Sequence, residues 1–339
     1  MTKKRRRPPP APLPPPKRRS HHRGRDWRLE AAVVAAFVVF LLVLVGFIGY
    51  GWWDSQMGPP HSKALQVGDT SFNLDFFSRR TKGFLQDVGL ANPGQQVDPN
   101  QLGTVVSVVA GILEQEVILR QRAPVDLEIT ATPEEVQSQI AGRLTVSPDD
   151  PVAFQAAYDA DLKKRDLSDK EYREMVEADV LSTKVSDGFV RAAPEVADQV
   201  RIRQIQVGAK EDADKALERL NAGEDFAVVA KDMSSDTTTK DQGGEKGWVT
   251  LEQLDSSYAA KVFALDVGQR SEALEVQGGF LIVEVEEKQA GRSLDSDQRD
   301  AVGGRYFSLW LNEQRALLRT TNYVSFDADK LQWVVDHAI

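Results

Sequence analysis

The chain has 339 residues, 41% of them hydrophobic, and carries a formal net charge of -9 at pH 7. This length permits two or three domains, and the apolar content is sufficient to bury their cores. The acidic net charge argues against nucleic acid as a partner. The absence of cysteine excludes disulfides, thiolate chemistry, Cys-based metal sites and lipid attached through a Cys. None of the four histidines stands at metal-ligand spacing with a partner, so we expect neither a metal nor another cofactor.

Residues 1–30 are predicted to form a disordered, basic, Pro-rich tail. Residues 3–30 carry eleven Lys or Arg against two acidic residues, a net of +9. The remaining chain is therefore strongly acidic. The sequence leaves open whether this tail only sets membrane topology or also binds lipid or protein.

Residues 31–53 contain no charged side chain and are long enough to span a hydrocarbon core of about 30 Å. Tyr50, Trp52 and Trp53 would mark the far interface. A cleavable signal peptide is the competing interpretation, but the apolar run is too long and no small-x-small site follows closely. We expect a single-pass anchor in the cell membrane. The basic tail would stay in the cytoplasm and the body would be extracytoplasmic.

Residues 54–66 are predicted to be a linker, and residues 67–197 the N-terminal part of a helical domain. Residues 67–72 indicate a small strand and turn, after which Asn73 can cap a helix. A second helix, at about residues 99–122, has apolar side chains around much of its circumference and is expected in the core.

Two capping boxes predict further helices in this part of the chain. Thr132 has Pro at the next position and Glu135 three residues later. Ser168 likewise has a glutamate, Glu171, three residues later. These are signals of the fold and carry no chemistry.

Residues 198–289 change to a mixed pattern that predicts a small α/β module. A strand from Val200 is followed by two short helices, the second capped by Asp225. A Gly-rich loop covers residues 235–248, and residues 280–285 have apolar side chains on both faces, as a central strand requires.

Residues 290–339 return to helix, with a broad apolar stripe over residues 297–319 that has no partner nearby in the sequence. We expect this helix to pack on the helices before residue 195, which would make the module an insertion into one helical domain. A strand and a short helix are expected within residues 323–339. The predicted fold class is α+β, a mostly helical domain with an inserted α/β module, preceded by one transmembrane helix.

Seven pieces of the module stand in an order and spacing that resemble parvulin-type (PpiC, rotamase) peptidyl-prolyl isomerases. They are Arg201–Val207, Ala222–Phe226, Ser235-Asp236, Gly243–Trp248, Val262–Leu265, Val267-Gly268 and Gly278–Val283. The flanks resemble the helical chaperone domain of the secretory foldases SurA, PrsA and PpiD, and the N-terminal anchor is most similar to that of PpiD. The resemblance implies a foldase that assists exported, unfolded polypeptides containing X-Pro bonds.

Rotation about an X-Pro bond must overcome a barrier of about 18–20 kcal/mol. A site can lower this barrier without a nucleophile or cofactor, by binding the twisted bond better than the planar one. The resemblance places Leu254, Tyr258 and Phe263 in the pocket for the proline ring, and the alternative role for each is in the ordinary core of the module. It places Thr237 where many members have Cys or Asp, beside Asp236, and a simple loop turn is the alternative for this pair.

Two positions depart from the family pattern, in which a His on the first strand and another on the last lie behind the pocket. Here Gln204 and Leu281 occupy them. Gln204 can still donate and accept hydrogen bonds, whereas Leu281 cannot. The expected catalytic set is therefore Gln204, Asp236 and Thr237, with weak activity and no activity both open. The alternative function is a non-catalytic holdase chaperone, and a purely structural envelope protein has less support.

Overall fold

The computed structural model describes residues 39, 41–46, 58–90, 99–147 and 149–338 of the chain. It divides into two compact units, residues 1–61 and 62–339. The expected basic tail lies outside the described residues. So does the expected membrane span at 31–53, apart from residues 39 and 41–46, which are helical and exposed. Within the part of the chain that is described, no helix combines the length and hydropathy needed to cross a membrane.

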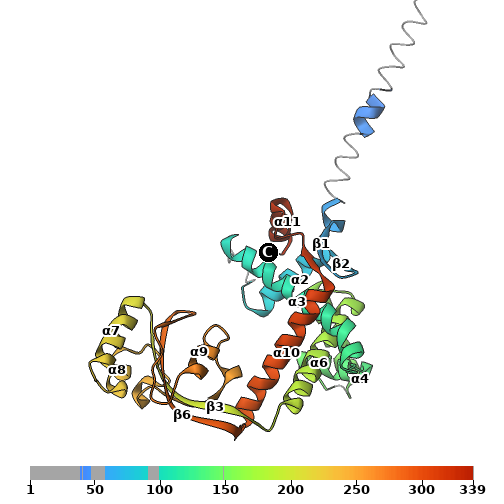
Figure 1. Cartoon of the computed structure of the whole chain (residues 1–339). Coiled ribbons are helices and arrows are strands. Elements are labelled where there is room, and N and C mark those ends of the chain that lie inside the picture. The colour runs from blue at the N-terminus through green and yellow to red at the C-terminus, as the bar shows by residue number, and fades with distance from the viewer. Residues whose placement is uncertain (1–38, 40, 47–57, 91–98, 148, 339) are drawn as a thin grey trace, which may run out of the picture. The chain divides into compact units, whose positions relative to one another are not determined.

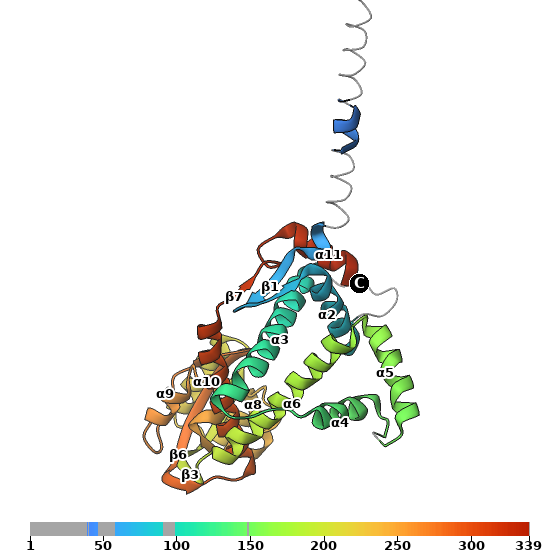
Figure 2. The ribbon, with the colours of Figure 1, turned by 90° about the vertical axis from the view of Figure 1, so that its right-hand side faces the viewer.

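The second unit consists of a mainly helical part and a small sheet-containing module (Figures 1 and 2). The helical part comprises β1 (Lys63–Val67), β2 (Thr70–Asn73), α2 (Leu74–Asp87), α3 (Pro99–Asp126), α4 (Pro133–Leu144), α5 (Pro151–Arg165), α6 (Asp169–Ala192), α10 (Ser296–Leu318), β7 (Thr320–Asn322) and α11 (Ala328–Ala338). The module comprises β3 (Val196–Val207), α7 (Lys210–Asn221), α8 (Phe226–Met233), η1 (Lys240–Gln242), β4 (Glu245–Thr250), η2 (Leu251–Gln253), α9 (Ala259–Ala264), β5 (Leu274–Val276) and β6 (Gly279–Ser293).

Strand β1 corrects the expected linker, because residues 63–66 belong to it. Ala64, Leu65 and Val67 are fully buried, and β1 is the central strand of an antiparallel sheet ordered β2-β1-β7. Its apolar side chains pack with those of α2, α3 and α11 in one core. This strand was missed because its second hydrogen-bonded neighbour, β7, lies more than 250 residues away in the sequence.

The predicted helix starts are confirmed. Asn73 accepts a hydrogen bond from the backbone of Phe76, and both predicted capping boxes are formed, at Thr132 and at Ser168. Helix α5 was not predicted. Only Phe154 and Tyr158 are buried along its length, which leaves little apolar periodicity to detect.

Helix α10 packs against α6 and α3, as its apolar stripe predicted (Figures 1 and 2). Trp310 and Leu311 of α10 share a core with Ile118 of α3 and with Leu181 of α6. At the closest approach, a Cβ atom added to Gly303 would lie 2.6 Å from the Cα atom of Val190. The N-terminal and C-terminal helices thus form one body.

The module is built on a four-stranded antiparallel sheet ordered β4-β3-β6-β5. The central strands pair from Val196 opposite Ser293 to Val207 opposite Phe280. Helices α7 and α8 contribute the core on one face, around Ile205 and Ile282. Leu254, with residues of α9, contributes the core on the other face, where Val283 is buried. This second face is the one that carries the candidate site.

Candidate functional site

Gln204 and Leu281 lie on the same face of the sheet. Residues directly opposite one another in antiparallel strands point to the same side. Gln204 is opposite Val283, and Gln206 is opposite Leu281. Because Val283 and Leu281 both belong to the apolar cluster on this face, Gln204 faces that side too. Gln204 and Leu281, the two positions at which the resemblance leads one to expect histidine, are therefore diagonal neighbours on adjacent strands.

The three residues expected in the proline pocket meet on this face. Leu254 is buried, and Tyr258 and Phe263 are half-buried, all within the cluster that contains Leu281. Leu254 follows η2, Tyr258 directly precedes α9 and Phe263 lies on α9. The fold thus groups three apolar side chains from a segment of ten residues beside the strand that carries Leu281.

In the polar part of the site, Asp236 accepts hydrogen bonds from three neighbouring residues. Its Oδ2 accepts hydrogen bonds from Nε2 of Gln204 (2.8 Å) and Oγ1 of Thr239 (2.7 Å), while its Oδ1 accepts from the backbone N–H of Thr238 (2.9 Å). Gln204 and Asp236 are thus brought together. Thr237 is exposed in the turn that follows Asp236.

The pKa of Asp236 lies well below its ordinary value. Burial alone would raise this pKa, but the hydrogen bonds from Thr239, Gln204 and Thr238 outweigh burial and lower it to about 2. Asp236 is therefore ionised at neutral pH. Since this pKa is depressed from 3.8, the stabilisation that it represents is complete above pH 3.8 and is lost as the pH falls toward 2.

The Gly-rich loop positions Asp236 through close contact with β3. The backbone N–H of Gln204 donates to the carbonyl oxygen of Gly244 (2.8 Å). Gly244 has a φ of +83°, and an added Cβ atom would lie 2.6 Å from the carbonyl oxygen of Gln204, so only glycine fits there. At the other end of the loop, the backbone N–H of Ser235 donates to the carbonyl oxygen of Gln206 (2.7 Å).

Two supporting residues were missed from the sequence. Oγ of Ser234 accepts from the backbone N–H groups of Gln206 (3.1 Å) and Asp236 (3.2 Å), and Thr239 donates to Asp236. The spacing of Asp236 and Thr239, three residues apart in a Ser/Thr-rich loop, is typical of side chains that close a turn. That signal could have identified Thr239.

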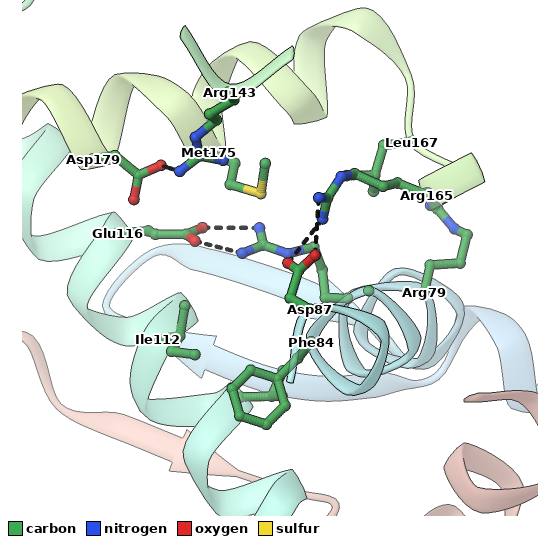
Figure 3. A pocket seen from close by; sticks show the side chains of 13 residues that line it. Arg79, Phe84, Asp87, Ile112, Glu116, Arg143, Arg165, Leu167, Met175 and Asp179 are labelled. Carbon is green, nitrogen blue, oxygen red and sulfur yellow. Dashed lines mark hydrogen bonds and ion pairs between the residues drawn. The ribbon is translucent and has the colours of Figure 1, made fainter. Parts of the chain in front are cut away.

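A cavity of about 160 Å³ in the helical part is lined by many charged side chains (Figure 3). Arg80 pairs with Glu116, Arg143 with Asp179 and Arg165 with Asp87. Burial raises the pKa of Asp179, against the opposing effect of Arg143. The opposite charges within each pair neutralise one another. The three pairs connect α2 to α3, α4 to α6 and α5 to α2, so we assign them a structural role in holding the helices together.

The described residues contain no group of three or more His, Asp or Glu side chains placed to hold a metal ion. The site on the sheet offers instead an apolar surface, a fixed carboxylate and a primary amide. Such a set can bind and orient a neutral peptide group and exclude water from it.

Comparison with known proteins gives two family matches. Residues 194–287 match the PPIC-type PPIase domain of the rotamase family, and residues 26–186 match the SurA-like N-terminal domain. Periplasmic chaperone PpiD of Haemophilus influenzae is 35% identical over 115 residues, which are 32% of this chain and 18% of that protein. Foldase protein PrsA 3 of Bacillus anthracis is 30% identical over 135 residues, 40% of this chain and 45% of that protein.

One similar solved structure is that of a single parvulin domain. The solution structure of the parvulin domain of PpiD from E. coli is 30% identical, covers 28% of this chain and 92% of that domain, and has a TM-score of 0.26. The chain spans less than half the length of the two curated relatives above. It combines a SurA-like N-terminal domain with a PpiC-type peptidyl-prolyl isomerase domain, and PpiD and PrsA are its homologues.

Proposed function

We propose that the protein is a peptidyl-prolyl cis-trans isomerase and foldase that acts on X-Pro bonds in unfolded, exported polypeptides. The observation that supports this most is the hydrogen bond between Gln204 and Asp236 on the sheet face that also carries Leu254, Tyr258 and Phe263. A polar pair and an apolar surface side by side are what a prolyl peptide requires, since its ring is apolar and its amide is polar.

The proline ring would lie against Leu254, Tyr258 and Phe263, where burial of apolar surface holds it in place. Gln204 uses one amide hydrogen for Asp236, which leaves its second amide hydrogen and its Oε1 for the substrate. The charge of Asp236 polarises this amide and fixes its orientation. Thr237, exposed in the turn, would add a hydroxyl for the substrate backbone.

Catalysis would come from stronger binding of the twisted amide. Twisting the X-Pro bond removes its resonance, so the imide nitrogen becomes a better hydrogen-bond acceptor than in the planar ground state. A fixed N–H donor at this nitrogen favours the twisted form, and the apolar surface excludes the water that would otherwise compete. The reaction makes and breaks no covalent bond and therefore needs no cofactor.

Leu281 is the observation that favours the second candidate function, a non-catalytic holdase. This side chain is only 5% exposed and supplies no hydrogen bond at the position where the family usually has a histidine. In that case the module would hold peptide segments without isomerising them. The helical part would shield apolar segments of the client.

The test is a prolyl-isomerisation assay of the full chain, with peptides that vary the residue before proline. We expect catalysis above the uncatalysed rate. Tyr258→Ala should lower kcat/KM by about tenfold or more, because burial of an aromatic ring contributes roughly 1.5–3 kcal/mol. Phe326→Ala, which removes an exposed aromatic ring from the helical part, is the control and should leave the rate unchanged. Suppressed aggregation of an unfolded client without any catalysis would establish the holdase instead.

We further propose that residues 31–53 anchor the protein in the cell membrane, with residues 1–30 in the cytoplasm and the body outside. The density of Lys and Arg before the apolar run supports this orientation, because Lys and Arg next to a membrane span are retained on the cytoplasmic side. The parts would be a linker at residues 54–62, the helical part up to residue 195, the isomerase module at 196–293, slightly longer than the expected 198–289 because β3 and β6 pair from Val196 to Ser293, and the C-terminal helical part at 294–339.

The proposed topology predicts the pattern of external proteolysis. Protease added outside the cell membrane should digest the body and leave a short fragment that carries an N-terminal epitope tag. Loss of the tag with the body intact would show the opposite orientation. Release of both parts into the soluble fraction before protease is added would show that residues 31–53 do not anchor the chain.

A further inference from the structure

The isomerase module is joined to the helical part by two neighbouring crossings of the chain (Figure 1). The chain enters the module between Ala192, the end of α6, and Val196, the start of β3. It leaves between Ser293, the end of β6, and Ser296, the start of α10. Because Val196 pairs with Ser293, the two crossings form one narrow connection. Two parts joined in this way ordinarily move relative to one another unless a large apolar interface holds them.

The apolar cluster at this connection is small. Its buried side chains are those of Ala193, Leu294 and Val302, and Ala197 packs against them. Two of these four residues are alanines, so the cluster buries little apolar surface and cannot by itself fix the angle between the two parts.

Farther along α10, the helix and the module face one another across an open groove of about 310 Å³. Leu251 on the module side is 43% exposed, and Leu309 on the α10 side is 49% exposed. These apolar side chains do not close into a core, so this region also leaves the orientation of the module open.

Two buried glutamines connect the module to α10 by hydrogen bonds. Nε2 of Gln298, in the first turn of α10, donates to Oε1 of Gln199 on β3 (2.9 Å) and to the carbonyl oxygen of Trp248 on β4 (3.1 Å). Nε2 of Gln199 donates in turn to the carbonyl oxygens of Arg292 (3.2 Å) and Ser293 (3.1 Å) on β6. The two side chains thus join α10 to three adjacent strands of the module.

Every hydrogen-bonding group of these two side chains has a partner. Oε1 of Gln298 accepts from the backbone N–H of Asp295 (3.1 Å), as part of the capping box of α10. Gln298 is 3% exposed and Gln199 is 1% exposed, so water cannot replace a partner that moves away. A buried polar group left without a partner costs roughly 1–3 kcal/mol. Rotation of the module away from α10 would leave several such groups unpaired.

Hydrogen bonds depend on angle, whereas apolar contacts do not, so a fully paired buried network favours one arrangement over its alternatives. We propose that Gln199 and Gln298 form an amide lock that holds the isomerase module in one orientation on the helical part. The two parts then move as one rigid body, and the fold sets the distance from the helical part to the proposed proline site. Without the lock, the module would turn about the connection at Val196 and Ser293. This orientation does not depend on catalysis by the module.

The experiment measures a distance between the two parts. The chain has no cysteine, so a pair of introduced cysteines can be spin-labelled specifically. Gln137→Cys on α4 and Glu218→Cys on α7 are both at exposed positions, one in each part. Double electron–electron resonance of the full chain in lipid nanodiscs then gives the distribution of distances between the labels.

Three substitutions are compared in this labelled chain. Gln298→Glu keeps the acceptor for Asp295 but removes both donors of the lock, and Gln298→Met removes donors and acceptor without adding a charge. Gln289→Glu is the matched control, because Gln289 is an exposed glutamine of β6 whose Oε1 accepts from Arg292, as a glutamate can. Circular dichroism checks the fold of each variant, and Gln298→Met decides the test if the buried charge of Gln298→Glu prevents folding.

We expect one narrow distance distribution for the wild type and for Gln289→Glu. Both Gln298 variants should give a distribution at least about twice as wide, because loss of the lock lets other orientations become populated. The rate of isomerisation of a short Ala-Pro peptide should be the same in all of them, since none of the substitutions lies in the proposed proline site.

A distribution as narrow in Gln298→Met as in the wild type would overturn the proposal, because other contacts would then set the orientation. A broad distribution in the wild type would overturn it as well. Failure of the wild type to isomerise the peptide would refute the proposed catalysis, and the distance comparison would still decide the lock.

Discussion

Gly303→Ala is expected to lower the free energy of unfolding by about 2–3 kcal/mol, the upper part of the range for overpacking a closely packed core. Gly303 lies on α10 where that helix meets α6, and an added methyl group would approach the Cα and backbone nitrogen of Val190 to 2.6 Å and 2.7 Å. These are main-chain atoms, which cannot rotate away. The two helices must therefore separate, and the core around Trp310 and Leu181 would lose contacts.

Gly304→Ala is the matched control. This neighbouring glycine is also in α10, but an added Cβ atom would have no atom within 4 Å. Since Ala is favoured over Gly in a helix by about 1 kcal/mol, Gly304→Ala should leave stability unchanged or raise it slightly. Thermal unfolding of the full chain, followed by circular dichroism, measures both variants. Equal stability of the two would show that α10 does not pack on α6 at Gly303.

Asp236→Asn is expected to lower kcat/KM for prolyl isomerisation by about 10- to 100-fold, because a hydrogen bond to a charged group contributes roughly 1.5–3 kcal/mol. The substitution removes the charge that polarises and orients the amide of Gln204. It also replaces one carboxylate oxygen by an NH₂ group, which cannot accept from Thr239 or from the backbone of Thr238.

Asp241→Asn removes the same charge from an exposed position in the same loop and serves as the control. Its kcat/KM should match the wild type. A similar loss in both variants would mean that the loop acts through its overall charge. No loss in Asp236→Asn would show that the carboxylate does not take part. Circular dichroism of each variant separates loss of activity from loss of fold.

Most of the helical elements could be predicted from the sequence, because their signals are local. Asn73, Thr132 and Ser168 cap helices within a few residues of themselves, and a stripe repeating every three to four residues is visible without knowledge of its partner. Strand β1 could not be predicted in the same way. It is stabilised by β7, from the other end of the chain, and a short strand has no capping signal of its own.

The site shows the same division between local and long-range information. The family resemblance indicated which positions to consider, and the apolar grouping of Leu254, Tyr258 and Phe263 follows from one short segment. The hydrogen bond from Gln204 to Asp236 joins residues 32 positions apart and depends on how the loop returns to β3. Neither periodicity nor capping can reveal such a contact, which acts together with the hydrogen bonds from Thr239 and Thr238 to lower the pKa of Asp236.

The central claim is that this module catalyses prolyl isomerisation with a non-titrating amide and a permanently charged carboxylate in place of imidazoles. The most direct test is kcat/KM of the full chain for an Ala-Pro peptide, measured as a function of pH. The pKa of Asp236 is about 2 and the module contains no histidine, so kcat/KM should be constant from about pH 5 to about pH 9. The claim is contradicted if no catalysis exceeds the uncatalysed rate, or if kcat/KM changes with a midpoint near 6.5, the ordinary pKa of histidine.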